Sequence, residues 1–130
     1  GGAGGVFGTR YLLTPQAQYT DKQKKILLES TGETLRTMAF DEARGTTGWP
    51  KGVDGRGVFN QTVVDYDAGH DVESRRKRYE QAAKEQDSER IVTWSGTGVG
   101  NMNDIIDAAD LTQKLTAEAK EAIESLRSVI

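Results

Sequence analysis

The chain has 130 residues and a formal net charge of -3, so its length suits one domain and is too short for a closed (β/α)₈ barrel, which needs about 200 residues or more. The acidic balance argues against a nucleic-acid partner, and with no cysteine and one histidine the chain has neither disulfides nor the ligands of a zinc cluster. No apolar run approaches the length of a membrane span, so we expect a cytoplasmic protein with no metal and no membrane partner.

The glycines are numerous and clustered. Fifteen of the 130 residues are glycine, which exceeds the usual share of about 7%. They gather in residues 1–8, 45–57 and 96–100. Because glycine allows backbone conformations and close approaches that a Cβ prevents, these segments are predicted to be places where backbone geometry determines the structure.

The first third of the chain predicts two strands with a helix between them. A strand within residues 4–13 is expected to end near Gly8, since glycines bound a β-branched and aromatic centre. Residues 20–30 have a helical pattern, because Thr20 and Gln23 have the spacing of a capping box and Gly32 supplies the stop. Residues 33–40 alternate in part and indicate the second strand.

The middle of the chain predicts a long loop followed by two helices. Residues 43–57 are too polar and glycine-rich for regular structure, but Trp49 favours an ordered loop. Residues 60–67 are expected to form a short helix, and Asp71 to cap a charged helix from Val72 to about Gln86. The basic residues 75–78 spread around that helix among acidic neighbours, which indicates a solvated charged face.

The last third predicts a strand, a glycine-rich turn and helices. The strand covers residues 91–95, and a helix follows the turn from about Asn103. Asp110 with Gln113 is predicted to cap the last helix. Its apolar residues recur every three or four positions and need a packing partner: Leu111, Leu115, Ala119, Ala122, Ile123 and Leu126.

Two turns that contain glycine are candidate ligand sites. Gly8 and Thr9 offer backbone N–H groups and a hydroxyl that can hold a phosphate, although the same pair also suits a tight turn at a strand end. Residues 95–100 lack the spacing of a Rossmann or P-loop motif. They are interpreted either as a wall against a flat ligand or as a close backbone approach at a helix entry.

His70 and the two tryptophans carry weaker signals. His70 lies between acidic residues in a loop that leads into a helix, and no nucleophile is recognisable beside it, so a surface or capping role is predicted. Trp49 and Trp94 lie beside glycine clusters and are interpreted as packing residues rather than as residues that stack on a cofactor.

Residues 1–15, 44–50 and 94–100 together resemble the C-terminal part of the nitronate monooxygenase family, formerly called 2-nitropropane dioxygenases, particularly its fungal members. The first segment is the most specific, because it matches the family pattern G-A-D-G-V-x-x-G-T-R-F with conservative changes such as Tyr11 for the usual Phe. The resemblance covers essentially the whole chain.

This resemblance implies an α/β chain that is the C-terminal fragment of a TIM-barrel flavoenzyme with bound FMN. Residues 1–13 would be the last barrel strand and its phosphate turn, residues 14–90 a smaller, mostly helical domain with the long glycine-rich loop, and residues 91–130 a return strand, a glycine-rich turn and the C-terminal helices. The residues expected to line the FMN phosphate are Val6, Phe7, Gly8 and Thr9. Ser95 and Gly96 would lie at the mouth of the site, facing substrate or flavin.

The implied reaction is the oxidation of nitronates or nitroalkanes by molecular oxygen. In the family, a histidine upstream in the barrel removes the proton α to the nitro group. The resemblance therefore implies that this chain holds no catalytic residue. Its partner would be the missing N-terminal portion of the barrel. His70 does not match that base. The alternatives are a flavin-dependent enoyl reductase of the same barrel group and a non-enzymatic α+β interaction module. The module would dock through the helix of residues 72–86. It would also need the strand expected within residues 4–13 and the last helix to pack within this chain.

Overall fold

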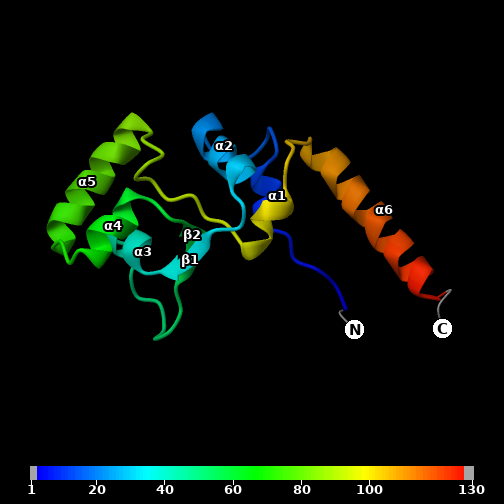
Figure 1. Ribbon diagram of the computed structural model, residues 1–130, viewed down its shortest axis with the longest axis horizontal. Helices are drawn as coiled ribbons and strands as arrows, with labels where there is room; N and C mark the ends of the chain where they lie inside the picture. Colours follow the sequence, from blue (N-terminus) through cyan, green and yellow to red (C-terminus); the bar gives the residue numbers. More distant parts are fainter. Residues whose placement is uncertain (1–2, 128–130) are drawn as a thin grey trace.

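The computed structural model describes residues 3–127 and has a mixed α/β fold with a small sheet among several helices (Figure 1). The helices and strands in chain order are α1 (Thr9–Leu12), α2 (Asp21–Glu29), β1 (Thr34–Thr37), α3 (Ala39–Arg44), β2 (Gly55–Val58), α4 (Gln61–Asp67), α5 (Val72–Glu85), the 3₁₀ helix η1 (Thr97–Asn101) and α6 (Ala108–Arg127). Strands β1 and β2 are antiparallel, with Thr34 opposite Val58 and Thr37 opposite Gly55.

Three helices lie where the sequence predicted them. Their capping residues are within three positions of the backbone N–H groups that they bind, so the signal is visible in the local sequence. Helix α2 begins after a complete capping box, in which the hydroxyl of Thr20 accepts from the backbone N–H of Gln23 and the Gln23 side chain accepts from Thr20. The side chain of Asn60 accepts from the N–H of Thr62 at the start of α4, and that of Asp71 accepts from the N–H of Ser74 at the start of α5. Each cap satisfies a backbone donor that the first turn of a helix leaves unpaired.

The strands of the sheet differ from the predicted strands in their bounds and in which segments pair. The second strand is shorter than residues 33–40, since β1 stops at Thr37 and the unpredicted helix α3 follows. Residues 55–57, the end of the predicted loop, form β2 together with Val58. The third predicted strand, residues 91–95, is reduced to a single bridge between Trp94 and Gly57. These pairings depend on partners distant in sequence, so local propensity does not reveal them.

The first predicted strand is not formed in the described residues. Residues 3–8 run as an irregular segment, Val6 is fully exposed and Phe7 is half-exposed. No strand lies beside this segment in residues 3–127, so its backbone has no ladder to join. Residues 1–2 of the predicted strand, and residues 128–130 of the predicted C-terminal helices, lie outside the described residues.

The last helix begins earlier than predicted, and the separate helix expected from about Asn103 is not formed, since residues 102–107 are irregular. Helix α6 starts at Ala108, and Asp107 rather than Asp110 caps it, because its carboxylate accepts from the N–H of Ala109 at 2.8 Å. A hydrogen bond from Gln16 and the bond from Ala109 lower the pKa of the Asp107 carboxyl. The bond from Gln16 also ties the start of α6 to the segment after α1.

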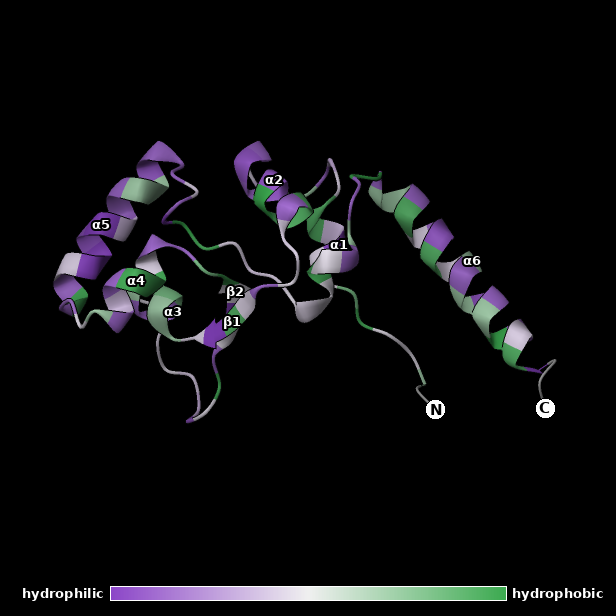
Figure 2. Ribbon diagram, in the orientation of Figure 1, coloured by the Kyte–Doolittle hydropathy of each residue, from purple (hydrophilic) through white to green (hydrophobic). Residues whose placement is uncertain are grey.

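The core consists of two apolar clusters. One lies between α3, α4 and α5 and contains Ala39, Phe40, Ala43, Val63, Tyr79 and Val92. The other joins the end of α1 to α2 and η1 through Leu13, Leu27 and Val99. Helix α6 projects from this body (Figure 1), and apolar residues recur along its length (Figure 2). Of its stripe only Leu111 is buried, and Ile123 and Leu126 are exposed.

Candidate functional site

The two segments predicted to hold a ligand meet in the structure. The N–H of Gly96 donates to the hydroxyl oxygen of Thr9 over 2.7 Å, although 87 positions separate the two residues. Gly8, Thr9, Ser95 and Gly96 line one open pocket of about 430 Å³. We refer to it as the Thr9 pocket; Leu12, Tyr19, Arg56 and Trp94 complete its lining.

Gly8 and Thr9 present unpaired donors at this pocket. Among residues 3–127, their backbone N–H groups have no hydrogen-bond acceptor. A Cβ placed on Gly8 would meet nothing within 4 Å, so the fold itself does not require glycine there. The Thr9 oxygen accepts from Gly96, which leaves the Thr9 hydroxyl hydrogen available for donation. The pair can therefore bind an anion with several donors.

Val6 and Phe7, also predicted as phosphate-lining residues, lie elsewhere. Val6 is fully exposed and does not line the Thr9 pocket. Phe7 instead lines a groove beside the start of α6, together with Arg10 and Leu111. The structure thus brings together four of the six predicted site residues and leaves Val6 and Phe7 apart from them.

Ser95 is held by the sheet rather than turned freely into the pocket. Its side chain is buried, and its hydroxyl donates to the carbonyl of Gly96 over 3.2 Å. The N–H of Ser95 donates to the carbonyl of Arg56 over 3.0 Å. These bonds fix the backbone of residues 95–96 against β2, so the Gly96 N–H points at Thr9.

Sequence reasoning missed Arg56, which supplies a positive charge to the pocket. Its guanidinium donates to the carbonyl of Thr34 over 3.0 Å, and this bond holds the side chain across β1. Arg56 stands between two glycines, which marks it as a charged residue in a glycine-rich segment. Because this segment was predicted to be loop, the sequence did not show which way the side chain points. A guanidinium beside free N–H donors adds to the preference for an anion.

Trp94 and Tyr19 form the apolar wall of the Thr9 pocket. The N–H of Trp94 donates to the hydroxyl of Tyr19 over 2.9 Å. Burial raises the pKa of Tyr19, so this hydroxyl stays neutral. The Trp94 ring meets Phe40 edge to face, with centroids 5.6 Å apart. Trp94 is therefore a packing residue, as predicted, and at the same time a wall of the pocket.

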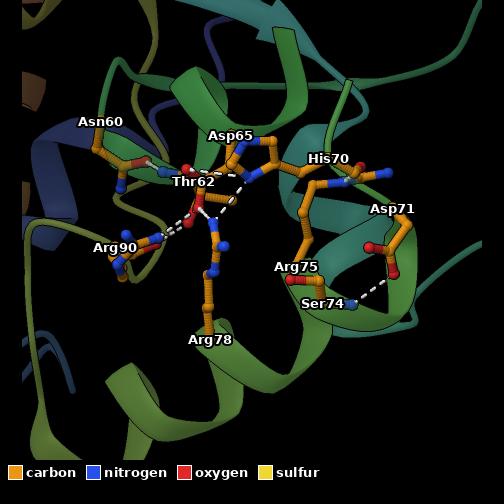
Figure 3. A network of polar contacts seen from close by, with 9 residues as sticks. All are labelled: Asn60, Thr62, Asp65, His70, Asp71, Ser74, Arg75, Arg78 and Arg90. Carbon is orange, nitrogen blue, oxygen red and sulfur yellow. Dashed lines mark hydrogen bonds and ion pairs between the residues drawn. The ribbon is translucent and has the colours of Figure 1, made fainter. Parts of the chain in front are cut away.

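His70 belongs to an ion-pair network between α4, α5 and the segment after α5 (Figure 3). The carboxylate of Asp65 accepts from Arg90 over 2.6 Å and pairs with Arg78 over 3.0 Å. Burial alone would raise the pKa of Asp65, but the hydrogen bonds from Arg90 and Arg78 outweigh it and lower the pKa to about 2. His70 lies 2.8 Å from Arg78 and 3.8 Å from Asp65. No nucleophile is among these partners, which fits a structural role.

The prediction of a solvated face at residues 75–78 is wrong for Arg75 and Arg76. Arg75 is buried and pairs with Glu42 over 2.8 Å, and Arg76 donates to the carbonyl of Glu42. Arg78 pairs with Asp65. Lys77 and Arg78 are exposed as predicted, and Lys77 lies near Glu73 in the preceding turn. The acidic partners lie on other helices, which is why the sequence of α5 did not reveal them.

Residues 3–127 contain neither a cluster of metal-ligating side chains nor a helix that could span a membrane. No group of three or more His, Asp or Glu side chains is arranged to hold an ion there. The helices of the same range are too short or too polar to cross a bilayer.

The fold is shared with part of FabK from Thermotoga maritima. The superposition has a TM-score of 0.69 at 18% identity and covers 95% of this chain and 39% of FabK. A mutant of the same FabK gives a TM-score of 0.62 at 18% identity, over 95% of this chain and 35% of that one. At this identity the likeness concerns the fold alone.

The sequence comparisons identify the family. The family model described as Nitronate monooxygenase matches residues 1–118, and the chain belongs to the nitronate monooxygenase family. It is 35% identical to a nitronate monooxygenase of Neurospora crassa over 98% of this chain and 35% of that protein. It is 28% identical to nitronate monooxygenase npaC of Metarhizium robertsii over 97% of this chain and 38% of that protein. The chain therefore spans little more than a third of the length of these relatives.

Proposed function

We propose that this chain is part of an FMN-dependent oxidoreductase that oxidises nitronates or nitroalkanes with molecular oxygen, and that it helps to bind the FMN phosphate. The bond between Gly96 and Thr9 carries the proposal, because it joins the two segments that the family resemblance assigns to the flavin. Membership of the nitronate monooxygenase family supplies the reaction class.

The Thr9 pocket has donors that suit a phosphate. The backbone N–H groups of Gly8 and Thr9 and the Thr9 hydroxyl would bind its oxygens, and Arg56 would offset its charge. Trp94 and Tyr19 would exclude water from one side. When bound, FMN supplies the electron acceptor of the reaction. The catalytic base is proposed to lie on sequence outside this chain.

The uncovered apolar surface supports placing the chain in a TIM barrel. In this proposal residues 1–13 are the last barrel strand and its turn, residues 14–90 the smaller domain, and residues 91–130 the return segment and outer helices. Val6 and Phe7 on the irregular segment, and Ile123 and Leu126 on α6, are exposed and would be covered by the rest of the barrel.

The same exposure disfavours the non-enzymatic module. That alternative needs the first segment and the last helix to pack within this chain, and in residues 3–127 they do not. A flavin-dependent enoyl reductase of the same barrel group is the second candidate, because the fold likeness to FabK shows an architecture that could serve either reaction. The two curated relatives, both named nitronate monooxygenases, favour the first.

The test measures FMN content and substrate choice in the full-length protein that contains this chain. Visible absorbance of the purified protein reports bound FMN, and Gly8→Val should abolish it without lowering the melting temperature of the apoprotein, since the added side chain begins in open space. Thr9→Val should also lose FMN, whereas Thr9→Ser should retain it because it keeps the hydroxyl.

Oxygen consumption with propyl nitronate, compared with reduction of an enoyl thioester by a nicotinamide cofactor, separates the two candidate reactions. Wild-type FMN content in both Gly8→Val and Thr9→Val would overturn the phosphate assignment. Turnover of the enoyl thioester alone would overturn the proposed reaction while leaving the phosphate assignment intact.

A further inference from the structure

A second pocket is lined largely by the long glycine-rich loop and has no role in the proposed flavin site. It has a volume of about 520 Å³, and its main walls are Trp49, Trp94, Val53 and the backbone of Gly55, with Arg44 and Asp41 of α3 at its edge. We call it the tryptophan pocket. Only Trp94 is shared with the Thr9 pocket, so the two sites have otherwise separate linings.

One wall of the tryptophan pocket is rigid. The Trp94 ring packs so closely on β2 that a Cβ on Gly55 would lie 2.3 Å from it. The edge-to-face contact with Phe40 and the bond from the Trp94 N–H to Tyr19 hold the residue from two other directions. Its indole face toward the pocket is thus fixed before any ligand arrives, which lowers the entropic cost of binding.

Another part of the lining is presented by a loop whose turns require glycine. Gly45, Gly48 and Gly52 have φ values of 73°, 100° and 83°, which other residues rarely adopt. These turns place Trp49 at the pocket with 58% of its surface exposed. The loop is therefore a shaped segment that presents two exposed apolar side chains, Trp49 and Val53, to the pocket that Trp94 also lines.

The tryptophan pocket also holds free hydrogen-bond donors. The guanidinium of Arg44 lies 5.8 Å from the centre of the Trp94 ring, and it makes no hydrogen bond within residues 3–127. Neither the Trp49 nor the Trp94 indole N–H has an acceptor in that part of the chain. An arginine on an aromatic face with unused donors can bind a planar anion through two parallel bonds.

The two carboxylates at the pocket already have partners. Asp41 accepts from the hydroxyl of Thr46 over 2.7 Å. Asp54 is paired with Arg36 over 2.6 Å. Asp54 is thus neutralised by Arg36, whereas Asp41 keeps its negative charge and is bonded to a neutral hydroxyl. Arg44 is the cation of the pocket lining, and it has no ionic partner among residues 3–127.

We propose that the tryptophan pocket binds a planar aromatic carboxylate. Its ring would lie between the indoles of Trp49 and Trp94, and its carboxylate would pair with Arg44. Offset aromatic stacking supplies the apolar contribution, and the volume is in the range of small-molecule sites, which is roughly 300–1,000 Å³. The proposal does not depend on FMN, since it uses none of the donors at Gly8, Thr9 or Gly96.

The experiment titrates the full-length protein with 2-naphthoate, its neutral analogue 2-naphthamide and the non-aromatic cyclohexanecarboxylate. Isothermal titration calorimetry measures the dissociation constant of each. We expect 2-naphthoate to bind about tenfold more tightly than the amide, because the amide lacks the charge-assisted bond. Cyclohexanecarboxylate should bind more weakly than 2-naphthoate, because it cannot stack.

The variants separate the contribution of the ion pair with Arg44 from that of aromatic stacking on Trp49. Arg44→Gln should remove the preference for the carboxylate over the amide, and Trp49→Ala should weaken both aromatic ligands while Trp49→Phe retains them. Lys51→Gln is the matched control, since it removes a positive charge from the same exposed loop without touching the pocket lining. Thermal melts of all variants check that the fold is intact.

Three results would overturn the proposal. The first is no binding of 2-naphthoate to the wild-type protein at millimolar concentrations. The second is an unchanged preference for the carboxylate in Arg44→Gln with an intact fold. The third is an equal loss of affinity in Lys51→Gln, which would show a general charge effect rather than a site at Arg44.

Discussion

The ring of Trp94 lies directly on the backbone of Gly55: a Cβ built at Gly55 would be 2.3 Å from Cζ3 of the indole. Real Cβ atoms do not come this close to another heavy atom, so the glycine is a steric requirement of the tryptophan. The glycine-rich sequence of β2 is poor in strand-forming residues, and this contact explains why glycine occupies that position.

Gly55→Ala should therefore destabilise the protein by about 1–3 kcal/mol, the usual cost of forcing extra atoms into a packed site. Urea unfolding, monitored by tryptophan fluorescence, measures this loss of stability. Gly98→Ala is the matched control, because a Cβ there meets nothing within 4 Å and its φ is not positive. Equal stability of the two variants would show that the Trp94 ring can move aside at little cost.

Asp65→Asn should cost about 1–3 kcal/mol at neutral pH, since it removes the charge that Arg78 and Arg90 share and leaves the two guanidinium groups facing each other. Urea unfolding of both proteins gives the difference. Glu73→Gln is the control, because the pair of Glu73 with Lys77 is exposed and should contribute little.

The same carboxylate sets a pH dependence. The Asp65 pKa is lowered from 3.8 to about 2 in the folded protein, so its stabilisation is present above the unfolded pKa and is lost as the pH falls through the folded pKa. The stability gap between wild type and Asp65→Asn should shrink between about pH 5 and about pH 2. A gap that stays constant across that range would show that the charge of Asp65 is not what stabilises the network.

Thr20→Ala should destabilise the protein by about 1 kcal/mol, because it removes the hydroxyl that accepts from the N–H of Gln23 at the start of α2. Thr20→Ser, which keeps the hydroxyl, should be close to wild type. Thermal unfolding of the three proteins distinguishes them, and an unchanged melting temperature for Thr20→Ala would mean that water replaces the cap without cost.

Local signals determined which parts of the fold the sequence could predict. The capped helices α2, α4 and α5 were predicted because their signals lie within a few residues of each other. Strand β2 and helix α3 were missed because β2 depends on a partner strand and on Trp94, and α3 has no side-chain cap. The partners of the α5 arginines, Glu42 and Asp65, were missed because they lie on other helices.

The candidate site could be predicted only by combining distant segments. Gly8 and Thr9 alone favour a tight turn over a ligand site, and the family resemblance linked them to residues 95–96. The bond between Thr9 and Gly96 joins these segments in space. Arg56 escaped prediction because its direction is set by β1, through its bond to Thr34, and not by its glycine neighbours.

Helix α6 offers the sharpest test of how this chain packs in a larger protein. Leu111 is 1% exposed and Leu126 is 64% exposed, although both belong to one apolar stripe. Within the 130-residue chain, Leu111→Ala should cost about 2–5 kcal/mol and Leu126→Ala less than about 0.5 kcal/mol.

In the full-length protein the two costs should converge, because the barrel is proposed to cover the end of α6 and would bury Leu126. Urea unfolding of both variants in both lengths of the protein measures this. Lys120→Ala controls for helix propensity, since it is an exposed position on the same helix. If Leu126→Ala is neutral in the full-length protein as well, the apolar face of α6 remains uncovered there and the barrel placement of this helix is wrong.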